Sequence, residues 1–159
     1  MKRNCIQVLS FIAINIFLQT ASFAQSKPLV IDKEKIFSVA ESKRLDSMLQ
    51  QYRKLTGKII LICSDTADVS QAKFTDNLAN KYAEGIKPKP YIFMLLLSQK
   101  RQHVLVSVND RIIAAVGQRS LLYILDAGIV SFRENKNEQG ATQICRKAME
   151  FLNSLPPNK

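Results

Sequence analysis

The sequence predicts an α/β fold in a single three-layer domain, and three features of the chain support this prediction. Two apolar runs between Tyr91 and Asn109, separated by the polar residues 99–102, are typical of a β-hairpin. An earlier apolar run, residues 58–64, is separated from the hairpin by a helical pattern, so it should run parallel to the first hairpin strand. This run is apolar on both faces, which indicates that helices flank the small mixed sheet on both sides.

The N-terminus has the pattern of an export signal. Lys2 and Arg3 precede an apolar segment from Ile6 to Leu18, and small residues lead up to Ala24. We expect residues 1–24 to be a signal peptide, with cleavage after Ala24 and a mature protein that is periplasmic or secreted. A retained anchor is the alternative, although the segment is short for a bilayer span, and no later segment should cross a membrane.

The rest of the chain reads as one domain. With 159 residues, of which 47% are hydrophobic, the sequence suits one core rather than two. We expect an extended lead-in over residues 25–37, the α/β domain over residues 38–155 and a short tail over residues 156–159. Pro28 supports the extended lead-in because its ring fixes φ and removes a backbone donor.

Four helices are predicted around the sheet. Ser38 and Glu41 have the spacing of a capping box at the start of the first helix, and Gly57 stands where a left-handed residue would end it. The third helix is apolar on most sides and should therefore be substantially buried. The predicted helices are residues 38–56, 71–84, 118–132 and 140–155, with a polar loop over residues 135–139.

The chain is basic, with 23 Lys and Arg against 13 Asp and Glu and a formal net charge of +10. It stays basic after a signal peptide that contains Lys2 and Arg3 is removed. This charge favours anionic surfaces, although solubility alone also explains it. Nucleic acid is not an expected partner, because the basic residues are spread along the chain without aromatic-interleaved motifs and because exported proteins rarely meet DNA.

Two cysteines, Cys63 and Cys145, remain after the expected cleavage. An oxidising compartment makes a disulfide between them possible. Their apolar sequence contexts are also typical of free, buried thiols. Both alternatives stay open at this stage.

A cluster of charged side chains is expected at one end of the sheet. Asp65 and Asp68 follow the strand 58–64, while Lys100 and Arg101 form the hairpin tip, so the parallel pairing brings both ends together. Open α/β sheets tend to bind ligands in this crevice. Two cations cancel most of the attraction of two carboxylates for Ca²⁺ or Mg²⁺, so an ion-paired surface fits better than a metal site.

No catalytic residue can be assigned from the sequence. Ser64 has no nearby histidine to activate it, and His103, the single histidine, is expected at a strand edge. Asp126 lies in the middle of an apolar helix. Because burying an unpaired carboxylate is expensive, Asp126 should face water, accept hydrogen bonds or pair with a cation.

Several short motifs follow one another along the chain. They are Val30-x-Asp32, Ile36-Phe37-Ser38-x-x-Glu41, Tyr52 with Thr56-Gly57 and the run Ile59 to Ile62, Asp76 to Tyr82, and Asp126 with Phe132-Arg133. In this order they resemble the TPM domain family, extracytoplasmic α/β domains that include thylakoid lumen phosphatase-like proteins and many bacterial exported proteins. The resemblance covers about residues 30 to 155, and it implies a structural pairing for Asp126.

The chain departs from the family pattern at two turns. Family members usually carry an acidic Asp-Asp-Arg turn in the hairpin, whereas Gln99-Lys100-Arg101 keeps only the arginine. They also usually carry a Gly-x-Gly turn after the third strand, and residues 108–112 contain no glycine. The resemblance implies the divalent-metal binding and phosphatase activity of some members, and the two departures argue against both.

We therefore expect an exported interaction or accessory module with an unknown protein partner at the periplasm or cell envelope. One alternative is a divergent metal-assisted phosphatase that uses Asp65 and Asp68, with Lys100 and Arg101 holding the phosphate. The other alternative is a basic binder of anionic membrane surfaces.

Overall fold

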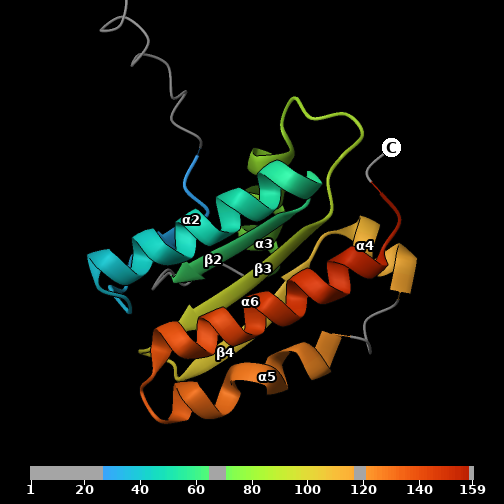
Figure 1. The fold of residues 1–159 in the computed structure, drawn as a ribbon. Helices are drawn as coiled ribbons and strands as arrows, with labels where there is room; N and C mark the ends of the chain where they lie inside the picture. Colours follow the sequence, from blue (N-terminus) through green and yellow to red (C-terminus); the bar gives the residue numbers. More distant parts are fainter. Residues whose placement is uncertain (1–26, 65–70, 117–120, 158–159) are drawn as a thin grey trace, which may run out of the picture.

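Four strands form one mixed sheet in the computed structural model, which describes residues 27–64, 71–116 and 121–157. The sheet order is β1-β2-β3-β4. The first three strands run parallel and β4 returns antiparallel to β3, so the prediction of a parallel crossover pair plus a hairpin is confirmed (Figure 1). The strands are β1 Val30–Asp32, β2 Ile59–Ser64, β3 Ile92–Ser98 and β4 His103–Val108.

Helices cover both faces of this sheet, which confirms the three-layer prediction. Figure 1 shows α2, α6 and α5 side by side on one face, with α3 on the opposite face. The helices in the described residues are α2 Val39–Thr56, α3 Gln71–Ala83, α4 Asp110–Val116, α5 Leu122–Arg133 and α6 Asn137–Ser154.

The first helix of the domain, α2, begins and ends where the sequence predicts. The Ser38 hydroxyl accepts a hydrogen bond from the Glu41 amide, and the Glu41 carboxylate accepts one from the Ser38 amide, which completes the capping box. Gly57 ends the helix with φ of 68°, and its amide donates to the carbonyl of Arg53 at 2.8 Å. Local chemistry alone therefore determines both ends of α2.

The core lies between the central strands and the helices on both faces, among them α2, α3 and α6. Every residue of β2 is buried, as are residues 92–97 of β3. Several side chains of α6 are buried against the sheet and its neighbouring helices, among them Ile144, Cys145 and Phe151. Cys63 on β2 and Cys145 on α6 are both buried in the core, and the structure contains no disulfide between them.

A buried cation fastens the end of α6 to the start of β2. The Lys58 ammonium donates hydrogen bonds to the carbonyls of Leu152, at 2.5 Å, and Leu155, at 3.2 Å. Leu152 lies in the last turn of α6 and Leu155 is its C-cap residue, so Lys58 adds to the capping bond from the Leu155 amide to the Leu152 carbonyl, at 3.1 Å. Removal from water lowers the pKa of Lys58 from its usual 10.5.

The fold differs from the sequence prediction in four elements. The lead-in is part of the sheet, because residues 30–32 pair with β2 as the edge strand β1. A short helix that was not predicted, α4, follows β4, and α6 begins at Asn137, inside the predicted polar loop. The fourth difference is α5, which exposes 68% of Leu122 and 58% of Val130. The prediction that this helix is substantially buried was therefore wrong, because α6 packs against only one side of α5.

The predicted signal peptide, residues 1–24, lies outside the described residues. In the parts that the structure describes, no helix is both long enough and apolar enough to cross a bilayer.

Candidate functional site

The carboxyl ends of the three parallel strands meet at one edge of the sheet. Asp32 at the end of β1 pairs in register with Ser64 at the end of β2, and Ser98 ends β3 in the neighbouring position. Their polar side chains converge there, at the edge where open α/β sheets tend to bind ligands. The site therefore starts from Asp32, Ser64 and Ser98.

Asp32 is an acceptor for three protein donors. Its Oδ1 accepts the Ile36 amide at 3.0 Å and the Ser64 hydroxyl at 2.5 Å, and its Oδ2 accepts the Phe37 amide at 2.8 Å. A carboxylate offers about four lone-pair positions, so most of them are filled. Asp32 thereby holds the turn that leads into α2, and Ser64 acts as a structural donor rather than as a nucleophile.

Glu34 holds the hairpin tip by accepting hydrogen bonds, as Asp32 holds the turn before α2. Its Oε1 accepts the Ser98 hydroxyl at 3.0 Å, while its Oε2 accepts the Gln99 amide at 2.8 Å and the Lys100 amide at 3.4 Å. The Glu34 amide in turn donates to Ser64 Oγ at 3.0 Å. One chain of hydrogen bonds therefore connects the ends of all three parallel strands to the tip of the hairpin.

The predicted cluster is only partly within the described residues. Lys100 and Arg101 are exposed at the hairpin tip, as expected, and the Arg101 amide donates to Ser98 Oγ at 3.3 Å. Asp65 and Asp68 lie outside the described residues, so their approach to these cations stays a prediction. The acid that contacts the tip in the described structure is Glu34, and Asp32 is linked to it through Ser64. Neither acid was among the predicted site residues.

The sequence contained a pattern that involves Asp32 but none that identifies Glu34. Asp32 belongs to the Val30-x-Asp32 motif, yet its lead-in was not predicted to be a strand. Glu34 makes its contacts with residues about 65 positions later, and no local pattern carries that information.

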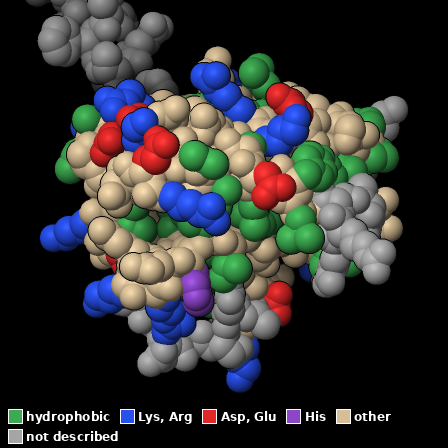
Figure 2. Space-filling view, turned by 90° about the horizontal axis from the view of Figure 1, so that it is seen from below, with side chains coloured by type: hydrophobic (Ala, Val, Ile, Leu, Met, Phe, Trp, Pro, Cys, Tyr) green, Lys and Arg blue, Asp and Glu red, His purple; other side chains and the backbone are tan. Residues whose placement is uncertain are grey.

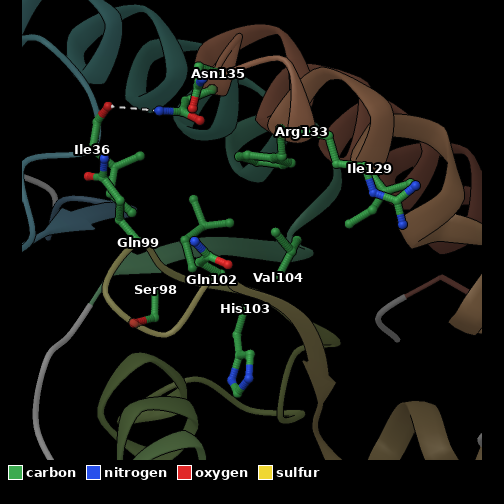
Figure 3. A pocket seen from close by; sticks show the side chains of 12 residues that line it. Ile36, Ser98, Gln99, Gln102, His103, Val104, Ile129, Arg133 and Asn135 are labelled. Carbon is green, nitrogen blue, oxygen red and sulfur yellow. Dashed lines mark hydrogen bonds between the residues drawn. The ribbon is translucent and has the colours of Figure 1, made fainter.

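A pocket of about 600 Å³ opens beside the hairpin tip (Figure 3). It is bordered by the tip, the end of α5 and the turn before α2. The exposed Arg133 brings a positive charge to its rim, and the Asn137 amide group donates to the Ile36 carbonyl at 3.5 Å across it. His103 is exposed at the start of β4, and in Figure 3 its ring points away from Val104 and Ile129.

Asp126 lies on the exposed side of α5. Its carboxylate therefore faces water, which is one of the environments expected for it. Within residues 27–64, 71–116 and 121–157, no cation pairs with it, so the implied structural pairing has no partner there.

The described residues do not fit a divalent cation of the kind that the resemblance implies. Among them, no group of three His, Cys, Asp or Glu side chains could hold a metal ion. The lone pairs of Asp32 and Glu34 are largely used by protein donors, and the hairpin tip adds the positive charges of Lys100 and Arg101. The geometry is that of a braced, cationic surface.

Comparisons with known proteins agree with this fold. The model of the TPM domain family matches residues 30–151. A solution NMR structure of the BA42 protein from Bizionia argentinensis is similar with a TM-score of 0.63 and 17% identity, over 80% of this chain and 88% of that one. The N-terminal domain of a P. gingivalis protein is similar with a TM-score of 0.58 and 17% identity, over 86% and 89% of the two chains.

A third solved structure, the N-terminal domain of the cg2496 protein from Corynebacterium glutamicum, has a TM-score of 0.56 at 11% identity and covers 89% of this chain and 93% of that one. No curated protein matches the chain. At these identities the similar structures bear on the fold alone.

Proposed function

The chain belongs to the TPM domain family, and from this premise we propose that it is an exported interaction or accessory module of the periplasm or cell envelope, without phosphatase activity. One observation carries the proposal. The Glu34 carboxylate stabilises the hairpin tip, where it accepts hydrogen bonds from Ser98, Gln99 and Lys100. A tip held in this way is a rigid surface for contact.

The charge at the tip favours an anionic partner over a metal ion. Lys100 and Arg101 are exposed there, and the Glu34 oxygens that offset them are directed at backbone and hydroxyl donors. A cationic surface raises the rate of encounter with acidic partners and depends on ionic strength. We expect contact through this tip to weaken as salt is added.

Phosphatase activity is tested with p-nitrophenyl phosphate in the presence of Ca²⁺, Mg²⁺ or EDTA. We expect turnover no higher than that of a buffer blank under all three conditions. Clear, metal-dependent turnover that disappears in Asp65→Ala, but persists in the exposed control Asp126→Asn, would overturn the proposal and support the phosphatase alternative.

Export and contact need their own tests. N-terminal sequencing of the mature protein should start at Gln25, and an intact Met1 would contradict cleavage. In envelope fractions, a crosslinked partner should be recovered with the wild-type chain and lost with Lys100→Glu/Arg101→Glu. If the same partner is recovered equally with both, the tip is not the contact surface.

Binding to anionic membrane surfaces is a second candidate, supported by the net charge of +10 and the exposed tip cations. Such binding should follow the fraction of anionic lipid in vesicles. Cosedimentation that is insensitive to anionic lipid would count against it.

A further inference from the structure

At one edge of the described sheet, β4 has no further strand beside it. β4, residues His103–Val108, pairs with β3 on one side and is the last strand of the described sheet. Its sequence, HVLVSV, contains no proline and no lysine, which are common devices for protecting an edge. A strand of this kind is a ready template for pairing with another extended segment.

The register shows which backbone groups face outward. The Asn109 amide donates to the Ile92 carbonyl at 3.1 Å, so residue 109 belongs to a hydrogen-bonded pair with β3. Because such pairs alternate along an antiparallel ladder, the amides and carbonyls of Val104, Val106 and Val108 point away from β3. This outer row is long enough to bond one more short strand.

The helix layer extends past this edge. Packed helices lie about 9 Å apart and strands about 4.8 Å apart, so each helix covers about two strands. α6 contacts β2 and β3, while α5 lies beside α6 and contacts only β4 among the strands, apart from weaker contacts. α5 therefore covers β4 and about one further strand position, which is vacant in the described structure.

An apolar groove occupies that position. A cavity of about 490 Å³ follows the edge from Leu105 to Val108. Side chains of α5, among them Leu122 and Leu125, line its other side, together with Ile113 of α4. Consecutive β4 residues line it although their side chains alternate between faces, which places the groove along the strand edge rather than over one face. Hydrophobic side chains gather on this surface near the single histidine (Figure 2).

Charge distinguishes the two ends of the groove. At the hairpin end, the exposed cations are Lys100, Arg101 and Arg133, and Arg133 lines the pocket that continues the groove past Val104. At the opposite end the exposed Asp110 follows β4, while the neighbouring Arg111 is half-buried, lies over the Tyr91 ring and donates to the Lys89 carbonyl. A strand from another protein that runs antiparallel to β4 would have its C-terminal end beside these cations. Carboxylates in such a strand would therefore be favourable at its C-terminal end.

We propose that the β4–α5 groove binds an extended segment of another protein as a fifth, antiparallel strand, with apolar side chains at alternate positions and acidic side chains at its C-terminal end. This inference rests on the proposed role as an interaction module and names a surface for it. A second copy of the chain is a poorer occupant, because the overhanging α5 of each copy would collide with that of the other.

The test is fluorescence anisotropy with a labelled octapeptide that carries valine at alternate positions and two glutamates at its C-terminal end. The peptide is acetylated and amidated, so only side-chain carboxylates are present. We expect saturable binding, weakened about tenfold or more in Leu122→Glu and changed by less than about twofold in Val130→Glu. Both residues lie exposed on α5, at 68% and 58%, but only Leu122 lines the groove.

A second measurement leaves the protein unchanged. N-methylation of the peptide amides that face β4 should abolish binding, whereas N-methylation of the alternate amides should be tolerated. A peptide with lysines in place of the glutamates should bind about tenfold more weakly and recover in Arg133→Glu.

Three results would overturn the inference. The first is the absence of saturable binding, and the second is an equal effect of the two methylation patterns. The third is concentration-dependent dimerisation in sedimentation velocity that Leu122→Glu abolishes and Val130→Glu preserves. That result would assign the groove to a second copy of the chain. Turnover of p-nitrophenyl phosphate tests the proposed function separately, so an active phosphatase that also binds the peptide leaves this inference intact.

Discussion

The hydrogen bonds of Asp32 predict a measurable loss of stability in Asp32→Asn. The wild-type carboxylate accepts bonds from the Ile36 and Phe37 amides and from the Ser64 hydroxyl. Each bond to a charged group contributes about 1.5–3 kcal/mol. Asparagine can keep its oxygen at the Oδ1 position, where Ile36 and Ser64 donate, but its NH₂ group then faces the Phe37 amide, so that bond is lost. The two bonds that remain fall to about half their strength because the acceptor is no longer charged. We use the lower end of the range because the residue is half-buried.

The free energy of unfolding should therefore fall by about 3 kcal/mol, a large share of the 5–15 kcal/mol typical of native proteins. For a domain of this size the melting temperature should drop by about 10 °C. Urea and thermal unfolding followed by circular dichroism measure both quantities. The matched control is Asp126→Asn, an exposed position where the change should stay within about 0.5 kcal/mol. An Asp32→Asn variant as stable as this control would refute the structural role of Asp32.

Three further predictions address other parts of the molecule. Glu34→Ala should speed hydrogen exchange at the Gln99 amide, which it binds at 2.8 Å, with little change at the centre of β3; unchanged exchange would contradict the bracing of the tip. Gly128→Ala should destabilise the protein by about 2 kcal/mol or more despite the higher helix propensity of alanine, because the added Cβ would lie 2.3 Å from the Gly140 carbonyl oxygen; a gain in urea midpoint would show that the α5–α6 contact can relax. Burial raises the pKa of the Cys145 thiol from 9.0 to about 12, so the folded protein keeps this proton while the unfolded chain loses it, and stability should fall as pH rises from 9 toward 12. Urea unfolding under reductant should show a shallower alkaline loss for Cys145→Ala, by up to about 1.4 kcal/mol per pH unit, and identical slopes would contradict the buried thiol.

The candidate site could be predicted from the sequence only in part. Lys100 and Arg101 were placed at the hairpin tip, beside the strand ends, because a parallel pair followed by a hairpin allows no other arrangement. Glu34 was not found, because its partners at the tip lie about 65 positions away in the chain. Contacts of that separation depend on how close the strand ends come, which no local pattern encodes.

The sequence alone established the elements whose causes are local. The capping box at Ser38, the left-handed Gly57 and the apolar runs of β2 and β3 act within a few residues, so α2 and the central strands follow directly from them. Tertiary structure decided the elements whose causes are not local. β1 has 3 residues, too few for a periodic pattern, and becomes a strand only because β2 is there to pair with it. The apolar face of α5 is half-open because the described sheet ends at β4, so that α6 and β4 are the elements that chiefly cover this helix.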